Sequence, residues 1–399
     1  MKGFFSFQIT IIFTFLLFIL LISCKKESFE GVCEKGINEL PINQLQIIGS
    51  HNSYRLKTYD PLFEHIKSLE QLFPDQIHSE ELDYWHESIA DQLEIHGVRS
   101  LELDVYYDPE GGAYSNRMGL QLIGEPVAAN IPELENPGYK VLHLLDFDYE
   151  TRHFTLQSAL TALKSWSDNR PDHLPLFILI EPKDNAIDDA LEEPISFLTR
   201  PAPITPEALN DLDQEIIDIF GQNLSRVITP DEVRGTYNSL NAAVQQGNWP
   251  NLKEAKGKLF FILITSGQER ENYLKDHPSL EDRVMFTFSQ PGEADCAFVK
   301  LDDPLTNEQM ISELVRQGYI VRTRADEGTL EARTGDYTRA MAALNSGAQI
   351  ISTDFYRPDP RNDTSSVWTD YQVAFDQNHT ARHNPVNGRM DLKDCSFED

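Results

Sequence analysis

Eight short segments of mostly apolar, often β-branched residues recur along the chain. Most are continuous apolar runs rather than alternating ones, which is typical of strands that are buried on both faces of a parallel sheet. The predicted strands are residues 45–52, 99–106, 140–147, 176–184, 258–265, 284–290, 319–326 and 349–356.

Helical patterns lie between many of these segments. In residues 155–167, for example, Leu156, Leu160, Leu163 and Trp166 fall on one face. Strands that alternate with helices predict a parallel sheet, and eight of them predict a single-domain (β/α)8 TIM barrel. The connection after the second strand is long and has no clear helix, so we expect an irregular barrel there. The other predicted helices are residues 88–96, 206–220, 306–317 and 337–345, with extra helices in 185–257.

The N-terminus carries an export pattern. Lys2 precedes an uncharged, apolar run over residues 4–22, which ends at Ser23-Cys24. This resembles a bacterial lipobox, with residues 1–23 as signal peptide and Cys24 diacylated; an uncleaved transmembrane anchor is the alternative. Both place the rest of the chain outside the cytoplasm. Lipidation at Cys24 predicts an anchor in the bacterial cell envelope, in the outer membrane or at the cell surface, a tether over 24–40 and a catalytic domain over 41–399.

Net charge narrows the choice of partners. Removal of residues 1–23, which hold one lysine, leaves 33 basic against 64 acidic residues, a net charge of −31. So acidic a chain is not expected to bind nucleic acid, and an anionic substrate would need a local cationic cluster or a metal. Cys33 and Cys395 flank the folded region and can pair if the two ends meet, since export permits disulfides.

Catalytic residue types stand at the ends of the first four predicted strands. In such barrels the functional groups lie at the C-terminal ends of the strands. Polar groups of this kind are costly to bury unpaired, so their recurrence on neighbouring strands indicates a site. The residues are His51, Asn52, Glu102, Asp104, His143 and Glu181.

The chemistry of these groups favours a hard cation. Asn52, Glu102, Asp104 and Glu181 offer only oxygen ligands, which suit calcium or magnesium, whereas zinc would more often recruit the histidines. Two histidines that are free of the metal can transfer protons near neutral pH. A cation beside two histidines is suited to phosphodiester cleavage, because it neutralises phosphate charge and acidifies an attacking hydroxyl.

Four sequence motifs carry a resemblance to a known family. IGSHNSY (48–54), VRSLELDVYYD (98–108) and ILIEPKD (178–184), together with His143, resemble the catalytic half of calcium-dependent phosphoinositide-specific phospholipase C. Residues 324–356 resemble the C-terminal part of its exported bacterial branch. The similarity runs from about residue 42 to 387.

The resemblance implies roles for these residues. His51 would stabilise the pentacoordinate phosphate, and His143 would protonate the diacylglycerol oxygen. Glu102 or Asp104 would take the proton from the attacking inositol 2-hydroxyl, and the products would be diacylglycerol and an inositol phosphate, with a cyclic phosphate as intermediate or product. The substrate would be phosphatidylinositol or a related lipid, and the enzyme a monomer. The implied Ca²⁺ ligands are Asn52, Glu102, Asp104 and Glu181.

Further residues are candidates for substrate binding. Lys183, Arg322 and Arg324 end predicted strands and can meet phosphate or inositol hydroxyls, and Tyr356 can stack on the inositol ring. For Arg322 an ion pair is an equal alternative, and for Tyr356 the alternative is packing. Arg322 would then pair with Asp326, Glu331 or Asp336. The residues expected to support the site, without binding the ion, are Asp146, Asp148 and Asp354.

Two other functions compete with this interpretation. A glycerophosphodiester phosphodiesterase shares the barrel and a similar residue layout, but usually begins with His-Arg-Gly, from which His51-Asn52-Ser53 departs. A non-catalytic lipoprotein that binds head groups is the second alternative, and the two histidines beside a full ligand set speak against it.

Overall fold

The computed structural model describes residues 29–70, 78–187, 189, 195–375 and 379–397. The predicted signal peptide and Cys24 lie outside the described residues. No helix in the described part of the chain has the length and apolar content that crossing a bilayer requires.

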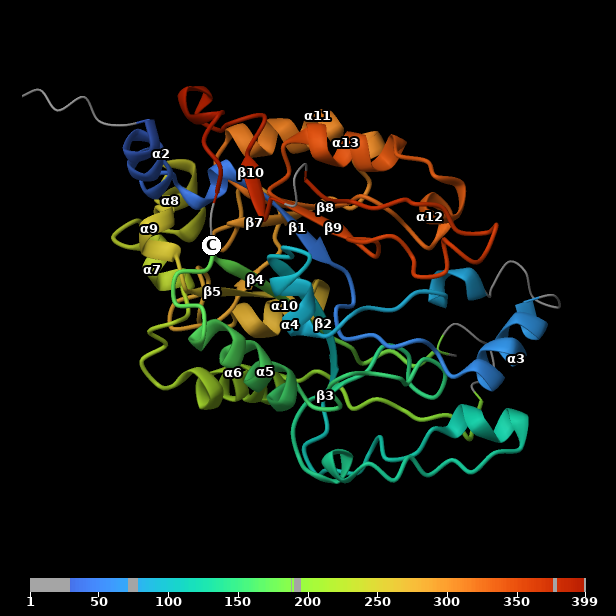
Figure 1. Ribbon diagram of the computed structural model, residues 1–399. Helices are drawn as coiled ribbons and strands as arrows, with labels where there is room; N and C mark the ends of the chain where they lie inside the picture. Colours follow the sequence, from blue (N-terminus) through green and yellow to red (C-terminus); the bar gives the residue numbers. More distant parts are fainter. Residues whose placement is uncertain (1–28, 71–77, 188, 190–194, 376–378, 398–399) are drawn as a thin grey trace, which may run out of the picture.

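Eight parallel strands within the described residues form a nearly closed barrel (Figure 1). Their order around the barrel is β6-β5-β4-β2-β1-β9-β8-β7, and a parallel bridge from Phe288 to Phe298 joins the two outer strands. The predicted (β/α)8 architecture is therefore confirmed. The barrel strands are β1 Leu45–Ser50, β2 Ser100–Tyr106, β4 Leu176–Pro182, β5 Leu259–Leu263, β6 Phe286–Thr287, β7 Phe298–Lys300, β8 Ile320–Arg324 and β9 Ile350–Thr353.

The barrel interior is apolar at one end and acidic at the other. Near the strand starts, the Phe177 ring stacks on Phe260 at 5.0 Å between centroids, and both rings meet Phe298. Side chains two apart on a strand share a face, so Glu181 at the far end of β4 points to the same interior as Phe177. The apolar layer thus supports a polar layer at the C-terminal rim.

Helices cover the barrel where the sequence predicts them. Their starts are fixed by hydroxyl caps: Ser88, Thr155 and Thr205 each accept a hydrogen bond from a backbone N–H in the first turn. The predicted helices are α4 Ile89–Glu94, α5 Leu156–Asp168, α6 Pro206–Phe220, α11 Pro304–Arg316 and α13 Thr338–Ser346. Apart from α2, the other α-helices in the described residues are α3 Asp60–Glu70, α7 Pro230–Arg234, α8 Leu240–Gln245, α9 Leu252–Ala255, α10 Gly267–Leu274 and α12 Leu330–Thr334.

The prediction that residues 140–147 form the third barrel strand is wrong. Only β3, Lys140–Val141, is extended there, and it pairs antiparallel with β2 outside the barrel. Leu142 and Leu145 pack instead into a small separate cluster with Tyr106 and Tyr149, so their apolar pattern is satisfied by a loop. The sequence pattern did not predict the barrel strand β7, which has three residues.

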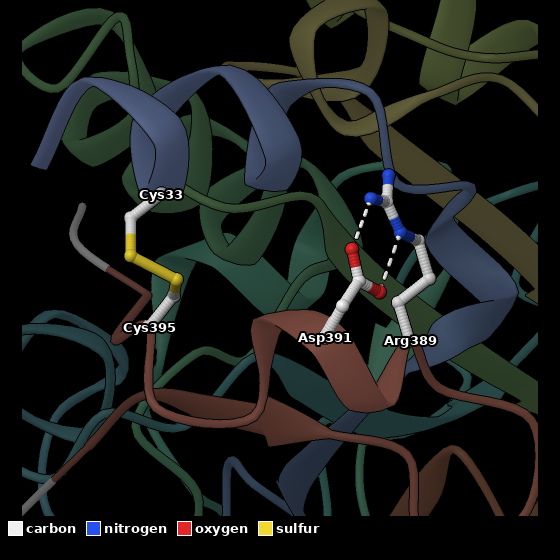
Figure 2. Close-up of a disulfide and its surroundings, with 4 residues drawn as sticks. All are labelled: Cys33, Arg389, Asp391 and Cys395. Atoms are coloured by element: carbon white, nitrogen blue, oxygen red, sulfur yellow. Dashed lines mark hydrogen bonds and ion pairs between the residues drawn. A yellow bond between two sulfur atoms is a disulfide. The ribbon is translucent and has the colours of Figure 1, made fainter. Parts of the chain in front are cut away.

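The two ends of the described chain meet at the amino end of the barrel. Helix α2, Phe29–Asn38, lies within the stretch predicted as a tether, and a disulfide joins its Cys33 to Cys395 (Figure 2). The conditional prediction that these cysteines pair is confirmed. Cys395 follows the short helix η6, Met390–Leu392, and strand β10, Ala381–His383, pairs antiparallel with β1.

Candidate active site

Three carboxylates converge on the rim from two adjacent strands. Asp104 on β2 lies opposite Glu181 on β4, and Glu102 precedes Asp104 by one pleat. One oxygen from each of the three lies within 4.8 Å of the others. Glu102 and Asp104 are buried at 3% and 0% exposure, so their charges need compensation.

Two cationic side chains contact this cluster. The Lys183 ammonium lies 3.0 Å from Asp104 Oδ2 and 3.4 Å from Glu181 Oε2, and Arg322 Nη2 donates to Glu102 Oε2 at 2.7 Å. Burial, aided by the neighbouring carboxylates and opposed by Lys183, raises the pKa of Asp104 to about 7. Burial also acts to raise the pKa of Glu102, but Arg322, His51 and the further cations Lys300 and Arg324 together outweigh it, so the net pKa is lowered.

The oxygen atoms at this point fit a calcium ion. Asn52 is buried in a left-handed conformation (φ 46°), and its Nδ2 donates to the Tyr84 hydroxyl at 3.3 Å. Its Oδ1 and Asp104 Oδ1 are buried without a partner among the described residues, and Asp104 Oδ2 has only the Lys183 ammonium beside it. Ser53 ties this loop to β2 through backbone and hydroxyl bonds to Glu102. Carboxylate and amide oxygens with no histidine among them, two of which have no partner, are the ligand types that a hard cation prefers.

His51 is oriented by a buried aspartate. Its Nδ1 lies 2.8 Å from Asp354 Oδ1, and Arg324 donates to the other Asp354 oxygen at 2.8 Å. Burial acts to raise the pKa of Asp354, but His51 and Arg324 outweigh it and hold the pKa far below its usual range. Asp354 is therefore an acceptor, Nδ1 carries the proton, and Nε2 faces Glu102 Oε1 at 3.9 Å.

His143 is oriented in the same way. Its Nδ1 lies 2.7 Å from Asp148 Oδ2, and its carbonyl accepts from the Tyr106 hydroxyl at 3.0 Å. Burial lowers the pKa of His143 to about 4, against the opposing effect of Asp148. His143 lies in the connection between β2 and β4 and does not end a barrel strand, which corrects the predicted placement.

A buried network connects the two histidines. Arg55 is fully buried, binds Asp148 with Nη2 at 2.6 Å, and lies over the Tyr84 ring at 4.2 Å. The Tyr84 hydroxyl in turn lies 3.3 Å from His51 Nδ1. The contacts of Arg55 and Tyr84 thus hold His51, Asn52 and His143 in place together.

Replacement of Asp148 by asparagine should destabilise the fold. Arg55 would keep a buried charge without a counter-charge, so we expect about 3–5 kcal/mol lower free energy of unfolding at neutral pH, measured by urea denaturation. Burial acts to raise the pKa of Asp148, but Arg55, His143 and Thr58 together outweigh it, so the net pKa is lowered. Its stabilisation is therefore present above its ordinary pKa of 3.8, and the difference between parent and variant should vanish as pH falls through the folded value.

The matched control is Asp168→Asn, which breaks the exposed pair with Lys164. Water screens that pair, so its loss should change the midpoint far less. Equal denaturation curves for parent and Asp148→Asn would contradict the network.

The predicted substrate-binding cations all pair with carboxylates of the site. Arg322 contacts Glu102 and Asp302, and none of its three alternative predicted partners. Arg324 holds Asp354, and Lys183 lies between Asp104 and Glu181.

Tyr356 is buried at 3% exposure and stacks on His86 at 5.3 Å between ring centroids. Its hydroxyl accepts from the Glu87 backbone N–H, and the His86 Nε2 donates to the His51 carbonyl at 2.7 Å. The alternative interpretation, packing, therefore fits Tyr356, which supports His51 through the ring of His86.

Supporting residues were found in part from the sequence. Asp148 and Asp354 hold the histidines, and Asp146 caps a loop by accepting from the Met118 and Thr199 backbone N–H groups. Tyr84 and Arg55 were missed. Arg55 directly follows the first motif, so its position could have been used to predict a role in the site. Tyr84 lies in a loop without a motif, so no sequence pattern indicated it.

A cavity of about 470 Å³ adjoins the carboxylate cluster at the ends of β4 to β7. Glu181 and Lys183 form part of its wall, and Thr265, Ser289 and Lys300 add polar groups. The rim therefore offers a polar space beside the cluster for a hydroxyl-rich ligand.

Comparison with known proteins gives a consistent result. A family model described as phosphoinositide phospholipase C, Ca²⁺-dependent, matches residues 40–385. A calcium-dependent phosphoinositol-specific phospholipase C from the Gram-negative bacterium Pseudomonas sp. is similar in structure, with a TM-score of 0.51 and 13% identity over 88% of this chain and 97% of that chain. A Ca²⁺-dependent phosphatidylinositol-specific phospholipase C from Streptomyces antibioticus has a TM-score of 0.46 and 16% identity, over 83% and 99%. A search of curated proteins finds no match.

Proposed function

Because this chain belongs to the family of calcium-dependent phosphoinositide phospholipases C, we propose that its rim site cleaves phosphatidylinositol-type lipids into diacylglycerol and an inositol phosphate. The family is one of phosphoric diester hydrolases that work with Ca²⁺. The observation that carries the assignment to this site is the carboxylate cluster flanked by two histidines, each held through Nδ1 by an aspartate.

Asn52, Glu102, Asp104 and Glu181 would hold the ion. Bound there, Ca²⁺ supplies positive charge to the phosphate and lowers the pKa of the attacking inositol 2-hydroxyl. Glu102 or Asp104 would accept the proton of that hydroxyl. The raised pKa of Asp104 belongs to the metal-free protein, and the added charge of the ion would favour its ionised form.

The histidines would act on the phosphate and the leaving group. His51 Nε2 faces the cluster and would donate to a phosphate oxygen as negative charge builds up in the transition state. His143, with its proton fixed on Nδ1, would protonate the diacylglycerol oxygen from Nε2. Attack by the 2-hydroxyl on its own phosphodiester forms a cyclic inositol phosphate and breaks the bond to diacylglycerol.

In this proposal, the cationic side chains near the cluster also contribute to substrate binding. Lys183 and Arg322 contact the carboxylates that would bind the ion, so an incoming phosphate or inositol ring would meet them directly. Arg324 would act through Asp354. Tyr356 is assigned no substrate contact, because His86 and His96 pack against its ring.

Hydrolysis of phosphatidylinositol tests the function. Activity should appear with Ca²⁺, disappear with a chelator and return when Ca²⁺ is restored, with diacylglycerol as the lipid product. Release of free glycerol phosphate would point to the glycerophosphodiester reaction instead. No turnover of any inositol lipid in the presence of Ca²⁺ would contradict the proposal and favour a binding protein.

We also propose that the protein is anchored in the bacterial cell envelope through a lipidated Cys24. The support is the lipobox pattern of residues 21–24 and the disulfide between Cys33 and Cys395, which suits an oxidising compartment. Mass spectrometry of the purified chain would detect diacylation and removal of residues 1–23.

A further inference from the structure

Helix α2, the first described element after the proposed anchor, and the candidate site lie at opposite ends of the barrel. Helix α2 precedes β1 and packs beside the segment that precedes β5: Leu252 N–H donates to the Leu40 carbonyl at 2.8 Å. His51 follows β1 directly. All barrel strands are parallel, so the starts of β1 and β5 share the amino end and the site lies at the other end. Figure 1 shows α2 with α8 and α9 on one side, and α3 and α12 on the opposite side.

The chain between the anchor and the folded domain is short. Four residues, 25–28, separate Cys24 from the first residue of α2. A fully extended chain spans at most about 3.3–3.6 Å per residue, so the step from Cys24 to Phe29 covers no more than about 18 Å. This limit holds for any conformation of those residues.

That reach is less than the distance the site would have to cover. Strand β1 has six residues and is about 20 Å long, and with a barrel tilt of about 36° it rises about 16 Å along the barrel axis. Helix α2, which as a helix is about 10 Å wide, lies beyond the start of β1, and the rim loops lie beyond its end. To turn its rim toward the membrane that holds Cys24, the molecule would have to place the whole barrel between α2 and that membrane. The connection is too short for this orientation.

The disulfide keeps the connection short. If α2 unwound, the free chain would run from Cys24 to Leu40 and could extend to about 55 Å, enough for the barrel to invert. The Cys33–Cys395 bond holds α2 to the domain, and Ile37 and Leu40 are buried beneath it at 8% and 0% exposure.

We infer that the anchored enzyme cleaves inositol lipids in a facing bilayer and spares those of the bilayer that holds its own anchor. The inference rests on the proposed function and on lipidation of Cys24. It assigns the substrate to a second membrane surface, because the rim is held away from the first.

Two labelled vesicle populations test the inference. The full, lipidated chain is inserted into phosphatidylcholine vesicles that carry phosphatidylinositol with one fluorescent acyl chain, and vesicles with a second label are added with Ca²⁺. We expect the facing vesicles to lose their phosphatidylinositol at least about tenfold faster. Insertion of about 15 Gly/Ser residues between Ser28 and Phe29 should raise turnover in the anchor's own vesicles to the rate in the facing ones, since such linkers are flexible.

Two further variants keep the outcomes distinct. A chain that begins at Lys25, which has neither the signal peptide nor the lipidated cysteine, should cleave both labels equally, and Cys33→Ser/Cys395→Ser should gain own-membrane turnover by releasing α2. Own-membrane turnover in the anchored parent as fast as in the insertion variant would overturn the inference. Lack of turnover in detergent micelles by the chain that begins at Lys25 would show instead that the proposed function fails, and the inference with it.

Discussion

Alanine at position 51 should reduce phosphatidylinositol turnover by about 10³-fold, within the range that positioned acid–base groups contribute. His51 Nε2 faces the carboxylate cluster, and Asp354 fixes the opposite side of the ring. Because the side chain would act mainly on the transition state, we expect the loss in kcat, with KM nearly unchanged. Steady-state kinetics with Ca²⁺ in excess would measure both values.

Controls separate catalysis from folding at His51. Asp354 keeps its bond to Arg324 in the variant, so thermal unfolding should remain close to the parent's. His65→Ala on α3, outside the site, should retain full activity. A His51→Ala enzyme that turns over within a few-fold of the parent would remove this residue from the mechanism.

Asparagine at position 104 should abolish the response to calcium. Loss of an outer-shell partner costs metal sites about 10–100-fold in affinity, so loss of a direct ligand should cost at least about 100-fold. Titration calorimetry would measure this, and activity should fall in parallel. At 100 times the dissociation constant, calcium should raise the parent's unfolding free energy by about 2.7 kcal/mol, an increase that the variant would lack.

The metal-free Asp104→Asn protein should be at least as stable as the parent. The folded pKa of Asp104, about 7, lies above its ordinary value of 3.8. Such a group contributes stability below pH 3.8 that is lost as pH rises through about 7, so the ionised carboxylate is unfavourable at alkaline pH. Asparagine removes that cost.

Glu215 offers a matched control for Asp104. Burial raises its pKa to about 7 as well, and it accepts from the Tyr139 backbone N–H at 2.7 Å, away from the cluster. Glu215→Gln should remove a similar burial cost and leave calcium binding intact. Retained calcium affinity in Asp104→Asn, or lost affinity in Glu215→Gln, would argue against the ligand set.

The barrel could be predicted because most of its strands are buried on both faces. Such strands read as continuous apolar runs, and β4 and β5 were found for this reason. The three-residue β7 offers too few positions for a period to show. Residues 140–147 have the composition of a strand, but Leu142 and Leu145 are buried in a side cluster, and sequence cannot tell which core an apolar residue joins.

The site could be predicted as chemistry but only in part as geometry. Carboxylates on one strand face must lie together, so Glu102 and Asp104 were assigned jointly. Contacts between residues distant in sequence were out of reach: His51 meets Asp354 across 303 positions, and Arg322 meets Glu102 across 220. The pairing of Arg322 was wrong because nearby acids were considered and remote ones were not.

The loop that carries His143 has one further consequence. Among the described residues, the two-residue β3 is its one ladder with the sheet, and side-chain bonds of Tyr106, Asp146 and Asp148 supply most of its other anchors. Regions with so few backbone bonds open locally at a fraction of the global unfolding energy. Amide hydrogen exchange should therefore be faster over 142–147 than in β2. Mild heating should abolish activity at a temperature where the circular dichroism spectrum is still that of the folded barrel.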